Sequence, residues 1–218
     1  MRIEAALLCA ALAAAPLQAQ EVASTAADAR AVIAAVLAQE VAVRGSEGAA
    51  QTCVTAQLDG LPPAPGAEEA MIPNHAVRIR FQWHVPDAPA PVRTAPPPPV
   101  PGQRNNRPRA APPLPPPAVL APDLAERLNA LRAEAARSAT TPVMTRIDPS
   151  MVPAPLRLQG PNDDCAMLSI SAPAFAGDAA FVTVGYSCSS VCGNGGLYAL
   201  QRREDRWELV GIADVWIR

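Results

Sequence analysis

A proline-rich stretch in the middle of the chain, from Pro86 to Pro122, constrains the fold more than any other feature. Prolines crowd this stretch, and few large apolar side chains interrupt them. Such a composition cannot bury enough apolar surface to fold, and it favours extended polyproline II backbone. We therefore expect residues 86–122 to be a disordered proline-rich insertion.

The parts of the chain on either side of the insertion do not suffice as separate domains. Residues 20–85 offer one helix and two strands, which is too little to build a stable core without help. The sequence therefore predicts one α+β domain. Its N-terminal part is residues 20–85, its remainder is residues 123–218, and the insertion forms a long loop between them.

The N-terminal part predicts one helix followed by two strands. Residues 25–44 carry apolar side chains at helical spacing, with Thr25 as a cap, and Gly45 ends the helix. Residues 51–58 and 76–85 are predicted to be strands, and the second alternates apolar with polar side chains. One face of that strand should therefore be buried.

The part after the insertion predicts a helix and a sheet. Asp123 can cap a helix that ends near Ser138, with Glu126 at the reciprocal position of a capping box. Four β-rich runs follow at residues 165–171, 179–187, 197–203 and 207–217. Because short turns join them, we expect an antiparallel meander sheet that packs against one or two helices.

The N-terminus has the pattern of an export signal. Arg2 precedes an apolar run that ends near Leu17, and Ala19 is a small residue at the expected cleavage position. The run is too short to span a membrane. We therefore expect residues 1–19 to be a signal peptide and the mature chain to be periplasmic or secreted, without a transmembrane segment.

Four cysteines remain once Cys9 leaves with the signal peptide. An even number of cysteines in an exported chain predicts disulfides, and four cysteines allow three pairings. A turn can close the four-residue step from Cys188 to Cys192, so we expect that bond, and with it a second bond between Cys53 and Cys165 across the insertion. A redox pair or half of a zinc site at Cys188 and Cys192 is the alternative. The glycines after Cys192 suit positive φ angles in a loop.

Charge and residue types exclude several kinds of chemistry. The net charge of −2 argues against nucleic acid as a partner. All basic side chains are arginines, so a catalytic lysine is excluded. His75 and His84 lack a metal-ligand partner at helical or strand spacing, and Asp163 and Asp164 suit a solvated turn. The sequence therefore predicts no catalytic residues, no metal and no cofactor.

The insertion offers a candidate contact surface for a partner. Its positive charges are four arginines, Arg93, Arg104, Arg107 and Arg109. Proline-rich segments serve either as spacers or as ligands for partner domains. We expect a spacer and keep partner contact by these arginines as the alternative.

The C-terminal quarter shows a resemblance to known proteins. The residues that carry it are Ser171 to Phe175, Cys188, Cys192-Gly193, Leu197-Tyr198, Trp207 to Val210 and Trp216-Ile217. This pattern resembles that of uncharacterised exported bacterial proteins in which an aromatic strand ends the chain. The Trp-x-Leu-Val run also resembles the last strand of cystatin-like and nuclear-transport-factor-like α+β folds. The resemblance implies a fold but no functional residues.

These observations predict an exported, non-catalytic domain that binds or scaffolds an envelope protein or glycan. The alternatives are a small exported enzyme, hydrolase-like or ligand-carrying, and an inhibitor or immunity-type protein. A pocket lined by Tyr186, Trp83 and polar groups would favour an enzyme or carrier. A filled sheet face with an exposed apolar patch would favour protein binding.

Overall fold

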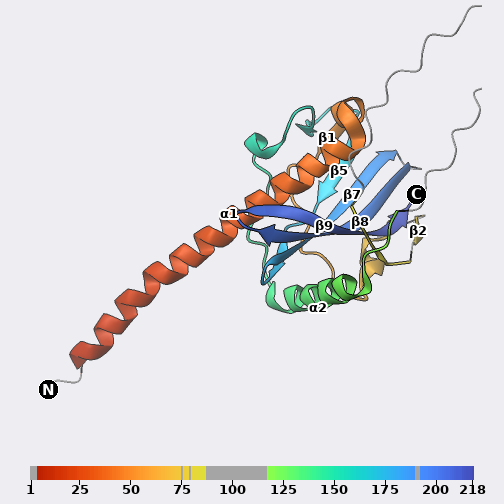
Figure 1. Ribbon diagram of the computed structural model, residues 1–218. Coiled ribbons are helices and arrows are strands. Elements are labelled where there is room, and N and C mark those ends of the chain that lie inside the picture. Colours follow the sequence, from red (N-terminus) through yellow and green to blue (C-terminus); the bar gives the residue numbers. More distant parts are fainter. Residues whose placement is uncertain (1–3, 75, 79, 87–116, 190–191) are drawn as a thin grey trace, which may run out of the picture.

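The protein is a mixed β-sheet with one helix on each face (Figure 1). The computed structural model describes residues 4–74, 76–78, 80–86, 117–189 and 192–218, with side chains from residue 25 onward except at Ser189. Helix α1 spans Glu4–Ala50 and helix α2 spans Pro122–Ser138. The predicted α+β class is therefore confirmed.

Nine strands form the described sheet. In chain order they are β1 Thr52–Val54, β2 Val77–Arg78, β3 Trp83–His84, β4 Arg157–Leu158, β5 Ala166–Ile170, β6 Ala174–Ala176, β7 Ala179–Ser189, β8 Cys192–Arg203 and β9 Arg206–Ile217. Their order across the sheet is β2-β9-β8-β7-β5-β1-β4, with β3 also paired to β9 and β6 to β7. Two short 3-10 helices, η1 Glu68–Met71 and η2 Pro149–Met151, lie in the connections.

The sheet is mixed, so the predicted antiparallel meander is only partly correct. Strands β7, β8 and β9 do form a meander, and β5 pairs antiparallel with β7. Strand β1, however, runs parallel to both β5 and β4. Parallel neighbours need a long connection. The chain between β1 and β4 supplies one, and it contains the whole insertion.

Two apolar cores fill the two faces of the sheet. Along β8, Tyr198 and Leu200 point into the core under α1, whereas Leu197 and Ala199 point into the core under α2. This alternation is the period of two that a strand covered on both faces requires. Trp207 packs on the α1 side, and both it and Trp216 are buried.

The helix ends differ from the prediction in two places. Gly45 has a φ of 68° and interrupts α1, as expected, but the helix begins at Glu4, so Thr25 lies inside the helix and not at its N-terminus. The N-cap of α2 is Ala121, with no side-chain hydrogen bond, and Pro122 takes the first helical position in place of a cap at Asp123. The fixed φ angle of proline suits that position, which explains the shift.

The two ends of the insertion lie side by side. The Val85 N–H donates to the Ala118 carbonyl at 2.7 Å, and the Leu120 N–H donates to the Trp83 carbonyl at 3.1 Å. The proline-rich segment therefore leaves and re-enters the domain at one point. Residues 87–116, including Arg93, Arg104, Arg107 and Arg109, lie outside the described residues.

Candidate functional site

The two disulfides join the cysteines paired in the sequence analysis. Cys53, in β1, is bonded to Cys165 just before β5, and Cys188 is bonded to Cys192. The Cα atoms of the two pairs are 5.8 Å and 5.4 Å apart. The first bond therefore ties together two neighbouring parallel strands that are 112 residues apart in sequence.

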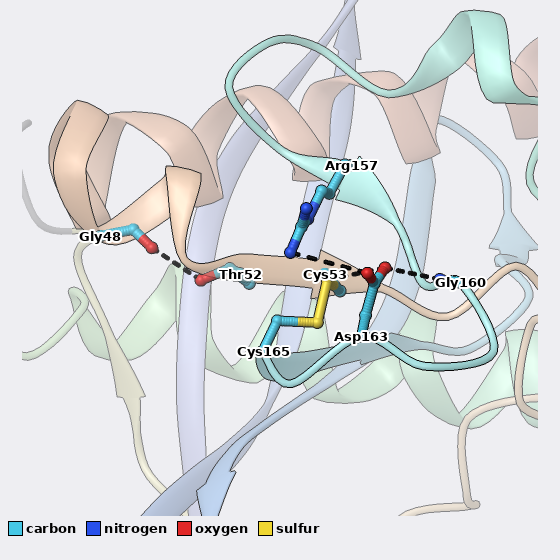
Figure 2. The surroundings of a disulfide bond; sticks show 7 residues. All are labelled: Gly48, Thr52, Cys53, Arg157, Gly160, Asp163 and Cys165. Atoms are coloured by element: carbon cyan, nitrogen blue, oxygen red, sulfur yellow. Dashed lines mark hydrogen bonds and ion pairs between the residues drawn. A yellow bond between two sulfur atoms is a disulfide. The ribbon is translucent and has the colours of Figure 1, made fainter.

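Asp163 organises the turn beside the first disulfide (Figure 2). Its Oδ2 accepts a hydrogen bond from the Gly160 N–H at 2.7 Å, and its Oδ1 lies 3.8 Å from Arg157 Nη2. The same carboxylate lies 3.8 Å from Cys53 Sγ. Among the described residues, the side chains of Cys53, Cys165 and Asp163 form the one group of three with metal-ligand spacing. Because both sulfurs are bonded to each other, the disulfide-bonded form offers no thiolate to a metal.

A hollow of about 430 Å³ opens on the α2 side of the sheet. Helix α2 covers β6 and the adjoining end of β7, and the segment from Asp59 to Pro73 passes over the part that α2 leaves open. The floor carries three hydroxyls, those of Ser169, Ser171 and Thr183. This volume lies in the range of small-molecule sites, roughly 300–1,000 Å³.

Three polar groups of this hollow have no partner in the part of the chain that the structure describes. The Ser171 hydroxyl is engaged, since it donates to the Ala172 carbonyl and accepts from the Thr183 N–H. The hydroxyls of Ser169 and Thr183 and the Asp59 carboxylate make no hydrogen bond or ion pair with any described residue. They are therefore available to a ligand.

Glycines shape the floor of the hollow. Gly185 in β7 pairs with both Ser169 and Gly195, and a Cβ atom on Gly185 would come within 2.8 Å of Ser169 Oγ. A Cβ atom on Gly195 would overlap the indole of Trp216. The predicted positive φ angles after Cys192 are wrong, because the chain there is already strand β8 and the positive-φ glycines among the described residues lie elsewhere. These glycines serve close packing.

A second polar group is buried between α1 and the sheet. The Tyr198 hydroxyl donates to Glu40 Oε1 at 2.5 Å, and Arg44 donates to Oε2 of the same carboxylate at 2.6 Å. The Arg44 guanidinium also lies 3.7 Å from the centre of the Tyr186 ring. Burial and the nearby Glu40 charge raise the pKa of Tyr198 well above its usual value. This cluster borders a cavity of only about 130 Å³.

Neither polar group was predicted from the sequence, although each has a recognisable sequence signal. Glu40 follows Ile33 and Val36 at helical spacing, so an acidic residue stands on the buried side of α1. Ser169, Thr183 and Gly185 occupy alternate positions of two strands, which puts small and hydroxyl-bearing residues on one face. Asp59 lies in a connection and follows no such periodicity.

A pocket lined by both Tyr186 and Trp83, which would have favoured an enzyme or carrier, does not form among the described residues. Trp83 is buried under α2, where its Nε1–H donates to Asn129 Oδ1 at 2.9 Å, whereas Tyr186 packs on the α1 side. His84 is half-buried, and its Nδ1 has no partner among the described residues. His75 lies outside those residues.

Comparison with known proteins finds no match: no protein-family model, no curated protein and no solved structure is similar to this chain. Within the described part of the chain, no helix is both long and apolar enough to cross a membrane. The function is therefore inferred from the hollow and its groups.

Proposed function

We propose that this protein is an exported domain of the cell envelope that binds a ligand without transforming it, and that the hollow beneath residues 59–73 is the binding site. The observation that carries the proposal is the set of unpartnered groups on Ser169, Thr183 and Asp59 around a cavity of about 430 Å³. Polar groups that converge on a preformed hollow supply the hydrogen bonds that hold and orient a ligand.

The composition of the hollow favours binding over catalysis. Its described lining contributes one carboxylate and three hydroxyls, and no histidine, cysteine or tyrosine. Acid–base hydrolysis generally needs a second titratable group opposite the first. The cavity beside Glu40 and Tyr198 has more titratable groups, but its 130 Å³ leaves little room and its groups bond one another. An enzyme is therefore the second candidate.

A panel of small probes tests the binding function. Amide resonances of the purified, disulfide-bonded protein are recorded with a neutral saccharide, inorganic phosphate, spermidine and benzene, each titrated separately. We expect at least one probe to shift the resonances of Ser169, Thr183 and Gly185 in a saturable way and to be recovered unchanged. If no class of probe shifts them, the proposed site is wrong. A probe recovered as a new compound would favour the enzyme.

Export is tested with the N-terminal segment alone. Residues 1–30, fused to an alkaline phosphatase that lacks its own signal, should give active enzyme, because that enzyme needs disulfides that form outside the cytoplasm. The fusion with Leu8→Arg and Leu12→Arg is the control and should be inactive. Equal activity of the two fusions would contradict export through this segment.

A further inference from the structure

The groups that line the hollow also indicate the chemistry of its ligand. Resting on the proposed binding function, we infer that the ligand is a neutral, hydroxyl-rich glycan segment that lies along a groove on the α2 side of the sheet. This inference is supported by the continuity of the groove, by its hydrogen-bonding groups, by its charged side chains and by its rigid wall.

The groove continues beyond the first hollow. A second hollow of about 200 Å³ extends past Ser187 to Arg218. The two hollows share four lining residues, Pro73, Ser169, Gly185 and Trp216. Because they share these walls, they form one elongated groove across β5 and β7. An elongated groove suits a chain of linked rings better than a compact ligand.

The hydrogen-bonding groups of the groove match those of a sugar. A hydroxyl both donates and accepts, so Ser169 and Thr183 can each bond to ligand hydroxyls in either direction. The Asp59 carboxylate only accepts and has two oxygens, so it can take hydrogen bonds from two neighbouring hydroxyls of one ring. A ligand with several hydroxyls can therefore pair with all three of these partly or fully exposed groups at once.

The charges of the groove favour a neutral ligand. Among its described lining, Asp59 in the first hollow and Arg218 in the second are the charged side chains. An anion in the first hollow would meet the Asp59 carboxylate, and a cation in the second would meet the guanidinium. Because Arg218 lines the second hollow, its guanidinium can donate to a neutral carbonyl or ether oxygen there.

One wall of the groove is rigid. Gly185 and Gly195 lie side by side in β7 and β8, and the absence of a side chain on Gly195 leaves room for the Trp216 indole. Trp216 is 6 % exposed and packs directly over Gly195, which fixes its indole. The part of the indole that stays exposed gives the groove a fixed apolar wall, against which the C–H groups of a sugar ring can pack.

Titrations with probes of three charge types test this inference. Cellobiose and the β-1,4 dimer of N-acetylglucosamine are the neutral probes, and inorganic phosphate and spermidine are the charged ones. We expect a neutral disaccharide to shift the amide resonances of Ser169, Thr183 and Gly185 and the indole resonance of Trp216. Neither charged probe should do so at the same concentration.

Variants with matched controls locate the site. Asp59→Asn should weaken disaccharide binding about tenfold or more, and Ser169→Ala about threefold to tenfold, because each removes a hydrogen bond to the ligand. Asp205→Asn and Thr141→Val are the matched controls: both residues are exposed and lie outside the groove. The controls should bind as the unaltered protein does.

The outcomes separate the ligand class from the binding function. If only phosphate or spermidine shifts the groove resonances, the glycan inference is overturned while the proposed binding function stands. Disaccharide binding that is unchanged by Asp59→Asn and Ser169→Ala would place the ligand elsewhere and overturn the groove. If no probe shifts any of these resonances, both proposals fail.

Discussion

At the scale of single residues, Glu40 shows how a charge can be kept inside this fold. The residue is 2 % exposed and stands among apolar side chains on the sheet-facing side of α1. Burying a lone carboxylate is costly, and this one is compensated by Tyr198 on β8 and by Arg44 one helical turn away. The cluster thus fixes the position of α1 along the sheet. Apolar contacts alone would fix that position less specifically, because they are not directional.

Removing the Tyr198 hydroxyl should therefore weaken the fold. We expect Tyr198→Phe to lower the free energy of unfolding by about 1.5–3 kcal/mol, the usual range for a hydrogen bond to a charged group. Tyr186→Phe is the matched control, because the Tyr186 hydroxyl makes no hydrogen bond with a described residue and its ring is kept. It should change stability by less than about 0.5 kcal/mol. Urea unfolding measures both, and equal losses would contradict the assignment.

The raised pKa of Tyr198 predicts a loss of stability in alkali. Burial and the Glu40 charge raise this pKa in the folded protein, whereas the unfolded chain titrates near 10.0. Below about pH 10 both states keep the proton, so stability is unaffected. As the pH rises from there towards the folded-state pKa, only the unfolded chain loses the proton and stability falls.

Absorbance at 295 nm checks this titration directly. The chain has two tyrosines, so in Tyr186→Phe the signal comes from Tyr198 alone. We expect this variant to show no tyrosinate absorbance near pH 10 and a sharp rise when it unfolds. A smooth titration near pH 10 in the folded variant would show that Tyr198 is open to solvent.

At the scale of elements, the long strands of the meander were predictable, whereas the short strands β4 and β6 were not. Strands β7, β8 and β9 are 11 or 12 residues long, so their alternation is repeated often enough to be recognised. Strands β4 and β6 have two and three residues, too few for a period to show. The direction of β1 could not be predicted from the sequence, because its partner strands β4 and β5 follow more than 100 residues later in the chain.

The candidate groove was only partly visible in the sequence for the same reason. Ser169 and Gly185 lie in strands that were predicted, so their shared face follows once the register is known. Asp59 and Pro73 belong to an irregular segment whose path depends on tertiary contacts. The alternation of side chains along a strand predicts which residues share one face of the sheet. It does not predict which loop will cross that face.

The break in α1 gives a prediction about one helix end. Gly45 has a φ of 68° with open space around its Cα, so an added methyl group meets no neighbour and only the backbone conformation matters. With ψ at 172°, this is a conformation essentially restricted to glycine, so Gly45→Ala should lower the free energy of unfolding by about 1–3 kcal/mol. Gly60 also has open space but no positive φ, so Gly60→Ala should be neutral or slightly stabilising. Equal effects in urea unfolding would show that α1 does not turn at Gly45.

At the scale of the whole molecule, the insertion and the first disulfide are linked by topology. The bond between Cys53 and Cys165 closes a loop that contains the proline-rich segment and both of its paired ends. Those ends are held by backbone hydrogen bonds at residues 83–85 and 118–120, so the fold does not depend on the segment to bring them together.

Shortening the insertion should therefore leave the fold intact. We expect replacement of residues 88–116 by four residues of Gly and Ser to keep the thermal midpoint within a few degrees, because loop-closure entropy changes only with the logarithm of length. Differential scanning calorimetry measures the midpoint. A collapse of the midpoint would mean that the segment packs against the domain.

The two disulfides should differ in their contribution to stability. In the chain-entropy model, a loop of 112 residues gains up to about 4–5 kcal/mol from its bond, against about 2 kcal/mol for the short loop between Cys188 and Cys192. Cys53→Ala with Cys165→Ala should thus destabilise more than Cys188→Ala with Cys192→Ala in urea unfolding. The reverse order would show that strand pairing, not the bond, holds β1 in place. Non-reducing peptide mapping of the unaltered protein checks the pairing itself.

The order of the cysteines along the chain also bears on how the protein matures. Both bonds join cysteines that are consecutive among the four that follow Cys9, namely Cys53 with Cys165 and Cys188 with Cys192. In a chain that is exported N-terminus first, an oxidase that joins each cysteine to the next one to emerge from the membrane would form these two disulfides directly. Helix α1, however, packs on β9, which arrives last. If the chain is exported in this way, the covalent framework can be complete before α1 finds β9, and we expect correct oxidation without a disulfide isomerase.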